Sequence, residues 1–95
     1  MLKDIVAVRP LDDHRLHLRF EDGVEGIVDI SKEIRFTGVF APLREKPFFD
    51  RVSVNTDFGT IVWPNGADLD PDVLYAKVTG RAILGAKRMR RTKDK

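Results

Sequence analysis

Polar and apolar residues alternate most clearly in residues 15–20 (Arg-Leu-His-Leu-Arg-Phe). This spacing puts every second side chain on one face, which is typical of a half-buried strand. The Glu-Asp-Gly at 21–23 then favours a hairpin turn, and residues 24–30 return as the next strand. A β-rich run at 4–9 precedes them and is closed by Pro10. Together these segments predict an antiparallel meander of three strands.

A second hairpin is predicted further along the chain. Residues 51–55 alternate again, and residues 60–63 (Thr-Ile-Val-Trp) are β-branched or aromatic, as a pleated surface favours. The intervening residues 56–59 form the turn. Between the meander and this hairpin, we expect a short helical turn capped by Asp29 or Ser31, and a single helical turn within 39–44.

The stretch from residue 60 to residue 78 predicts a strand, a tight turn and a capped helix. Pro-Asn-Gly at 64–66 fits a β-turn, because Pro fixes φ at its second position and Asn and Gly accept unusual backbone angles. Asp70 followed by Pro71 is typical of a helix N-terminus, and Asp72 adds favourable charge to the first turn. Apolar residues at helical spacing follow, namely Leu74, Tyr75 and Val78.

The pattern as a whole predicts an α+β domain. It has a small antiparallel sheet of about five strands (a meander plus a hairpin), a short helical connection, and a C-terminal helix packed on the sheet. Residues 1–80 form the single domain, and residues 81–95 form a basic C-terminal tail or frayed helix.

Composition narrows the classes of function. The chain has 95 residues and no Cys, which excludes disulfides, thiolate catalysis and most zinc sites. Its N-terminus lacks the apolar run of a signal peptide, and no stretch has the length of a membrane span. We therefore expect a cytoplasmic protein without membrane contact.

Charge is distributed unevenly along the chain. Residues 81–95 hold seven basic residues and one acidic residue, a net charge of +6, which leaves −4 for residues 1–80 out of the total of +2. Clustered Lys and Arg attract phosphates, so the tail is a candidate for weak, non-specific contact with nucleic acid or for contact with a partner. The candidate contact residues are Arg81, Lys87, Arg88, Arg90, Arg91 and Lys93.

The string from residue 59 to residue 75, Gly-Thr-Ile-Val-Trp-Pro-Asn-Gly-Ala-Asp-Leu-Asp-Pro-Asp-Val-Leu-Tyr, resembles the signature of a domain family of unknown function, DUF2442. The resemblance extends over about residues 4–78. It implies a compact α+β domain from bacteria or archaea and brings no catalytic residues. Some members of the family carry an added DNA-binding segment, or are encoded beside a second small protein in toxin–antitoxin fashion.

Two patterns suggest metal ligands, and neither is complete. Asp68, Asp70 and Asp72 alternate as in a calcium loop, but Val73 and Thr79 occupy the positions where that loop needs Gly and an acid. His14 and His17 are three residues apart, a spacing that a strand would place on opposite faces. We expect no metal and no cofactor.

Candidate binding residues lie in the signature segment: Trp63, Asn65, Asp68 and Tyr75. Trp63 has two interpretations, a core residue or a surface anchor for a partner, since Trp is enriched at binding hot spots. Asp68 is expected to bond to the backbone of the turn.

Two classes of function follow. The first is a non-enzymatic binding or regulatory module that docks a partner protein, as the antitoxin-like half of a pair, or a second copy, while its tail contacts nucleic acid. The alternative is a small enzyme whose site is unrecognised and needs neither Cys nor metal.

Overall fold

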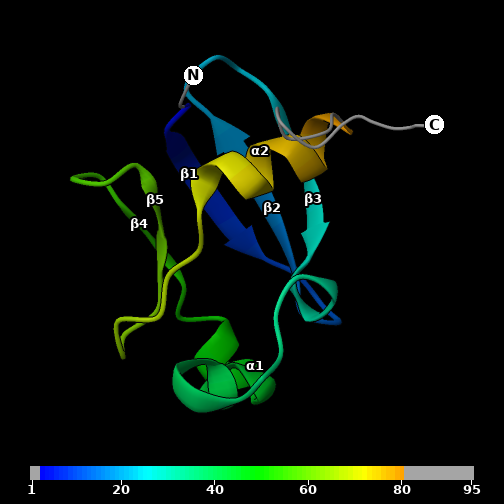
Figure 1. Cartoon of the computed structure of the whole chain (residues 1–95), viewed down its shortest axis with the longest axis vertical. Coiled ribbons are helices and arrows are strands. Elements are labelled where there is room, and N and C mark those ends of the chain that lie inside the picture. Colours follow the sequence, from blue (N-terminus) through cyan, green and yellow to red (C-terminus); the bar gives the residue numbers. More distant parts are fainter. Residues whose placement is uncertain (1–2, 81–95) are drawn as a thin grey trace, which may run out of the picture.

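The structure, a computed structural model, describes residues 3–80 (Figure 1). Three strands form an antiparallel sheet in the order β1–β2–β3, and two more form a separate hairpin, β4–β5. The strands are β1 (Ile5–Pro10), β2 (Arg15–Phe20), β3 (Glu25–Asp29), β4 (Ser53–Asn55) and β5 (Thr60–Val62). The α+β class and the five strands are confirmed, with the strands divided between two sheets.

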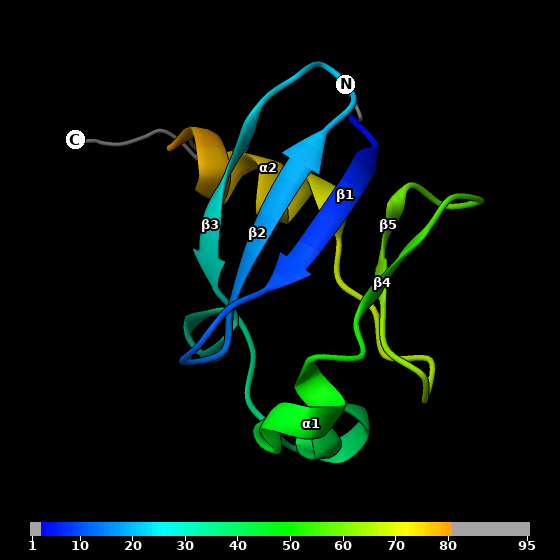
Figure 2. The same ribbon diagram turned by 180° about the vertical axis from the view of Figure 1, so that it is seen from behind.

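Three helical segments connect the two sheets, and a fourth follows β5 at the end of the described residues. They are the 3₁₀ helices η1 (Ile30–Lys32) and η2 (Gly38–Arg44), and the α-helices α1 (Lys46–Phe49) and α2 (Pro71–Thr79). Helix α2 packs on one face of the three-stranded sheet, the inner face, while α1 lies beyond one end of the strands (Figure 1). From behind, no described element covers the opposite, outer face (Figure 2).

The meander follows from the alternation of residues along β2. Leu16 and Leu18 are fully buried on the inner face, while Arg15 and Arg19 are exposed on the outer face. Gly23 has φ +90°, and its N–H donates to Phe20 O at 2.9 Å, so the predicted Asp-Gly turn is confirmed.

The core lies between the inner face of this sheet, the β4–β5 hairpin and α2. Backbone contact joins the two sheets, since Ile5 N–H donates to Gly59 O at 2.8 Å. The buried apolar side chains come from every part of the described chain: Ile5, Leu16, Leu18, Phe20, Val28, Ile30, Leu43, Phe49, Val52, Ile61, Trp63, Ala67 and Leu74.

Helix α2 begins where its sequence predicts. Asp70 Oδ1 accepts a hydrogen bond from Asp72 N–H at 2.9 Å, and Gly80 closes the helix with φ +73°. Leu74 is buried in the core. Near its end, Val78 lies so close to Gly26 of β3 that a Cβ at Gly26 would meet it at 2.8 Å.

The connecting segment differs from the expectation in detail. Residues 38–44 form a seven-residue 3₁₀ helix rather than a single turn, and residues 46–49 add a short α-helix with Pro47 in its first turn, where proline is tolerated. The cap at the end of the meander is Asp29, whose Oδ1 accepts from Ser31 N–H at 3.0 Å.

The second hairpin is shorter than predicted. Strand β4 begins only at Ser53, because Arg51 and Val52 still follow the turn that ends α1. Strand β5 ends at Val62, because Trp63 N–H donates to Ala67 O at 2.9 Å and the chain turns there.

The cap of α2 yields a stability prediction. Replacing Asp70 with Ala removes the acceptor for a helix N–H, so we expect a loss of about 1 kcal/mol in the free energy of unfolding. For a domain of this size, that loss lowers Tm by about 4–8 °C. Thermal unfolding followed by circular dichroism measures it, and Asp57→Ala, in the β4–β5 turn, is the control for loss of an exposed carboxylate. An equal Tm for Asp70→Ala and wild type would contradict the cap.

Candidate functional site

The signature segment holds distant parts of the chain together. Trp63 is 1% exposed, and its indole Nε1–H donates to Phe49 O at 2.9 Å. Its ring also lies against the Phe49 ring, with centroids 5.9 Å apart. Trp63 is therefore a core residue, and the alternative that it anchors a partner from the surface is wrong.

Asn65 has a similar structural role. Its side-chain Nδ2–H donates to Val39 O in η2 at 2.8 Å, and its Oδ1 accepts from Ala67 N–H at 3.2 Å. The turn formed by residues 63–66 is closed by Gly66 N–H, which donates to Trp63 O at 2.9 Å, as Pro-Asn-Gly predicts. Asn65 thus fixes the turn and ties it to η2.

Asp68 and Tyr75 lie apart from each other. Asp68 is exposed next to the turn, pairs with Val62 through a backbone bridge, and has no side-chain hydrogen bond to the turn backbone within residues 3–80. Tyr75 packs edge-on against Phe20, and its hydroxyl donates to Asp22 Oδ2 at 2.6 Å. The four candidates therefore do not form one site.

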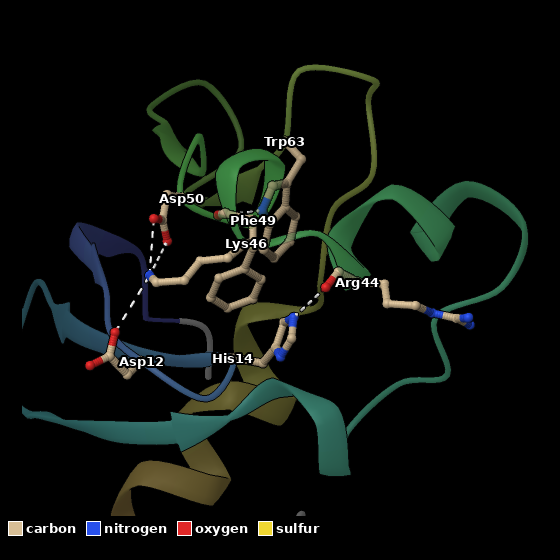
Figure 3. A network of polar contacts seen from close by, with 7 residues as sticks. All are labelled: Asp12, His14, Arg44, Lys46, Phe49, Asp50 and Trp63. Carbon is tan, nitrogen blue, oxygen red and sulfur yellow. Dashed lines mark hydrogen bonds and ion pairs between the residues drawn. The ribbon is translucent and has the colours of Figure 1, made fainter.

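His14 lies in a second network, near α1 (Figure 3). Its ring packs against Phe36 and Phe49 with centroids 4.9 and 5.0 Å away, and Nε2 lies 3.0 Å from Arg44 O. His14 also has φ +58°, an uncommon conformation for a residue with a side chain. These contacts tie the β1–β2 loop to α1.

Lys46 adds ion pairs at the edge of this network. Its Nζ lies 3.0 Å from Asp50 Oδ2 and 3.7 Å from Asp12 Oδ1 (Figure 3). The hydrogen bonds to Asp50 raise the pKa of Lys46. Exposed pairs of this kind contribute little to stability, so the ion pairs of Lys46 mainly connect the β1–β2 loop to α1.

The outer sheet face is the better candidate for a functional site. A shallow depression of about 430 Å³ lies there, open to solvent. It is lined by Ala7, Val8, Arg9, His17, Arg19 and Glu25.

Strand register explains why these side chains meet. Arg9 of β1 lies opposite His17 of β2, and Arg19 lies between Ala7 of β1 and Glu25 of β3. His17 Nε2 is 3.0 Å from Glu25 Oε1, which leaves both arginines without an ion pair within residues 3–80.

Exposed apolar side chains border the same face. Val6, beside a register irregularity in β1, is 47% exposed, and Ile27 of β3 is 54% exposed. The alternation along β2 identifies Arg15, His17 and Arg19 as outward residues. The alternation does not reveal that no helix of residues 3–80 covers these side chains, which is why the sequence did not suggest this site.

The remaining sequence-based candidates are placed as follows. The tail residues Arg81, Lys87, Arg88, Arg90, Arg91 and Lys93 lie outside the described residues. Within residues 3–80, no three His, Cys, Asp or Glu side chains gather closely enough to hold a metal ion, and no helix has the length and apolar character to cross a membrane.

Comparison with known proteins gave one match. A family model described as "Protein of unknown function (DUF2442)" matches residues 5–80. No curated protein and no solved structure matches the chain significantly.

The Tyr75–Asp22 hydrogen bond predicts a pH-dependent effect on stability. The Tyr75 hydroxyl, followed by the Val24 N–H, lowers the pKa of Asp22 below its usual value. A carboxyl with a lowered folded-state pKa adds stability above its unfolded pKa, about 3.9, and that stability is lost as pH falls through the folded-state pKa. Tyr75→Phe should therefore lower Tm at pH 7, and this deficit should shrink toward pH 2.

Melting curves of wild type, Tyr75→Phe and Asp22→Asn at pH 7 and pH 2 measure this effect. Asp22→Asn serves as the matched variant, because it removes the same charged acceptor while the Tyr75 ring stays on Phe20. Equal Tm deficits for Tyr75→Phe at both pH values would show that the hydroxyl contributes through packing and not through the carboxylate.

Proposed function

Because the chain belongs to the DUF2442 family, whose function is unknown, we propose its function from the geometry of the outer sheet face. The domain is a binding module that docks an acidic surface of a partner protein on this face. One observation carries the proposal: residues 3–80 leave the face uncovered (Figure 2), and two exposed arginines, Arg9 and Arg19, line its shallow depression.

The chemistry of the face suits a protein surface. Arg is enriched at the centres of protein interfaces, because its planar guanidinium pairs with carboxylates in two-point geometry. Val6 and Ile27 add exposed apolar area at the border of the face. Small-molecule sites enclose most of their ligand, whereas this depression lies open on a sheet.

Nucleic acid fits the face less well. Sheets that bind single strands stack bases on aromatic side chains, and the residues lining this depression include no Phe, Tyr or Trp. Glu25 also places a negative charge at its border. These features favour a protein partner.

The basic tail, residues 81–95, is proposed to contact nucleic acid separately from the docking face. Its net charge of +6 supports weak, sequence-independent contact with phosphates. An antitoxin-like pairing with a small companion protein would be one instance of docking on the outer face. Both remain proposals.

Capture from a native cell lysate tests the assignment with matched variants. The double variant Arg9→Glu/Arg19→Glu should lose its partner protein by at least about tenfold, as loss of interface arginines predicts. The control Arg35→Glu/Arg51→Glu makes the same charge change at exposed arginines away from the depression. It should retain the partner, and so should a chain that ends at Gly80.

Two further readouts complete the experiment. Hydrogen exchange of the recovered complex should show protection in β1 and β2, and nucleic acid should be recovered with the full chain but not with the chain ending at Gly80. Equal capture by both double variants, or loss of the partner on removing residues 81–95, would contradict docking on the outer face.

A further inference from the structure

Strand β3 forms a free edge of the three-stranded sheet. The order β1–β2–β3 places β1 and β3 at the two edges of the sheet. Strand β1 contacts both strands of the β4–β5 hairpin. Beyond β3, the ribbon shows no further strand in residues 3–80 (Figures 1 and 2). A free edge offers a row of backbone donors and acceptors to another strand.

The alternation of hydrogen bonds between β2 and β3 shows which backbone groups of β3 are available to another strand. Phe20 N–H donates to Val24 O at 2.8 Å, and Ile30 N–H donates to His14 O at 2.9 Å. In an antiparallel ladder, bonded pairs recur every second residue, so Gly26 and Val28 bond to β2. The N–H and C=O groups of Glu25 and Ile27 therefore point away from β2, and the described part of the chain supplies no hydrogen-bond partner for them.

The side chains along this edge carry a distinct charge pattern. Glu25, Ile27 and Asp29 project on the outer face as acid, apolar residue and acid. Glu25 is 55% exposed at its side chain, Ile27 is 54% exposed, and Asp29 is half-buried. The Ser31 hydroxyl donates to the Asp29 carboxylate and lowers the pKa of that carboxyl, which favours its ionised form. A Lys or Pro, which commonly protects an exposed edge, is absent from β3.

This charge pattern disfavours pairing with a second copy. If two copies of β3 paired antiparallel along their full length, Ile27 would face its counterpart. Each Glu25 would then face the other copy's Asp29, and like charges directly opposite each other destabilise strand pairing. The edge is therefore complementary to a different strand, one that carries positive charge at the flanking positions.

We propose that β3 binds an extended segment of a partner protein as a fourth strand of the sheet. The segment carries Lys or Arg two residues before and two residues after an apolar residue. The apolar residue packs beside Ile27, and the two basic residues pair with Glu25 and Asp29. Backbone hydrogen bonds to Glu25 and Ile27 supply affinity, and the charge pattern supplies register and specificity.

This edge site adjoins the outer docking face and shares Glu25 and Ile27 with the border of that face. The edge site depends on backbone groups and on two carboxylates, while docking on the outer face depends on Arg9 and Arg19. A partner with both features would engage the sheet twice. Either site can fail its test while the other passes.

Peptide titration of the full 95-residue chain tests the edge site. The probe is the heptapeptide Thr-Lys-Thr-Val-Thr-Lys-Thr, followed by ¹H–¹⁵N NMR at low salt. Its addition should shift the amide signals of residues 24–30 saturably and slow the exchange of the Glu25 and Ile27 amides several-fold. A control peptide of the same composition, Thr-Thr-Lys-Val-Lys-Thr-Thr, places its charges on the opposite face of the added strand and should not bind.

Three variants sharpen the result. Ile27→Pro removes the outward N–H without removing a bond to β2, and Glu25→Lys reverses one flanking charge. Both should lose probe binding, whereas Glu45→Lys, an exposed acid away from the sheet, should keep it. In antiparallel pairing, position 6 of the peptide lies opposite residue 25. The peptide Thr-Lys-Thr-Val-Thr-Glu-Thr should therefore restore binding to Glu25→Lys, a rescue that a general loss of structure would not show.

Several outcomes would overturn the edge site. The first two are equal binding of the two Lys peptides and changes in amide NMR signals that map away from β3. The other two are unchanged probe binding by Glu25→Lys and slow hydrogen exchange of the Glu25 and Ile27 amides in the free chain. The variant Arg9→Glu/Arg19→Glu should still bind the probe, and loss of binding there would assign the probe to the outer face instead.

Discussion

One buried hydrogen bond, from the indole of Trp63 to the carbonyl of Phe49, is the contact on which the position of the β4–β5 hairpin against α1 depends. It fixes the end of β5 against α1, and Asn65 adds a second tie from the same turn to η2. A buried carbonyl left without its donor costs about 1–3 kcal/mol, and a large aromatic ring adds its own buried area. Folding thus explains the contacts that Trp63 and Asn65 make in the signature segment.

Because α2 and the β4–β5 hairpin both pack from one side, the small core is complete without using the outer face of the sheet. A domain of this size has few elements with which to cover a second face. The result is a sheet with one apolar face inside and one charged, partly apolar face outside, bordered at β3 by a free edge. The proposed docking function rests on this outer face, which residues 3–80 leave uncovered.

Local sequence signals predicted local structure well. Pro-Asn-Gly at 64–66, the Asp70 cap and the Asp-Gly turn each act through neighbouring backbone groups, so their outcome depends on few other residues. The links that join segments were not predictable in this way, since Asn65 reaches Val39 across 26 residues and Tyr75 reaches Asp22 across 53. The candidate site was missed for the same reason. Alternation shows which side chains of β2 share a face, but whether another element of residues 3–80 covers that face depends on how all the elements pack.

The central claim, that Trp63 is a buried structural residue, is tested most directly by fluorescence, because the chain has a single Trp. Iodide quenches exposed indoles and cannot enter a packed core, whose density is close to that of an organic crystal. We expect iodide to leave the emission of the native protein nearly unchanged and to quench strongly the same protein unfolded in urea. Equal quenching of the native and unfolded states would place Trp63 at the surface and contradict its structural role.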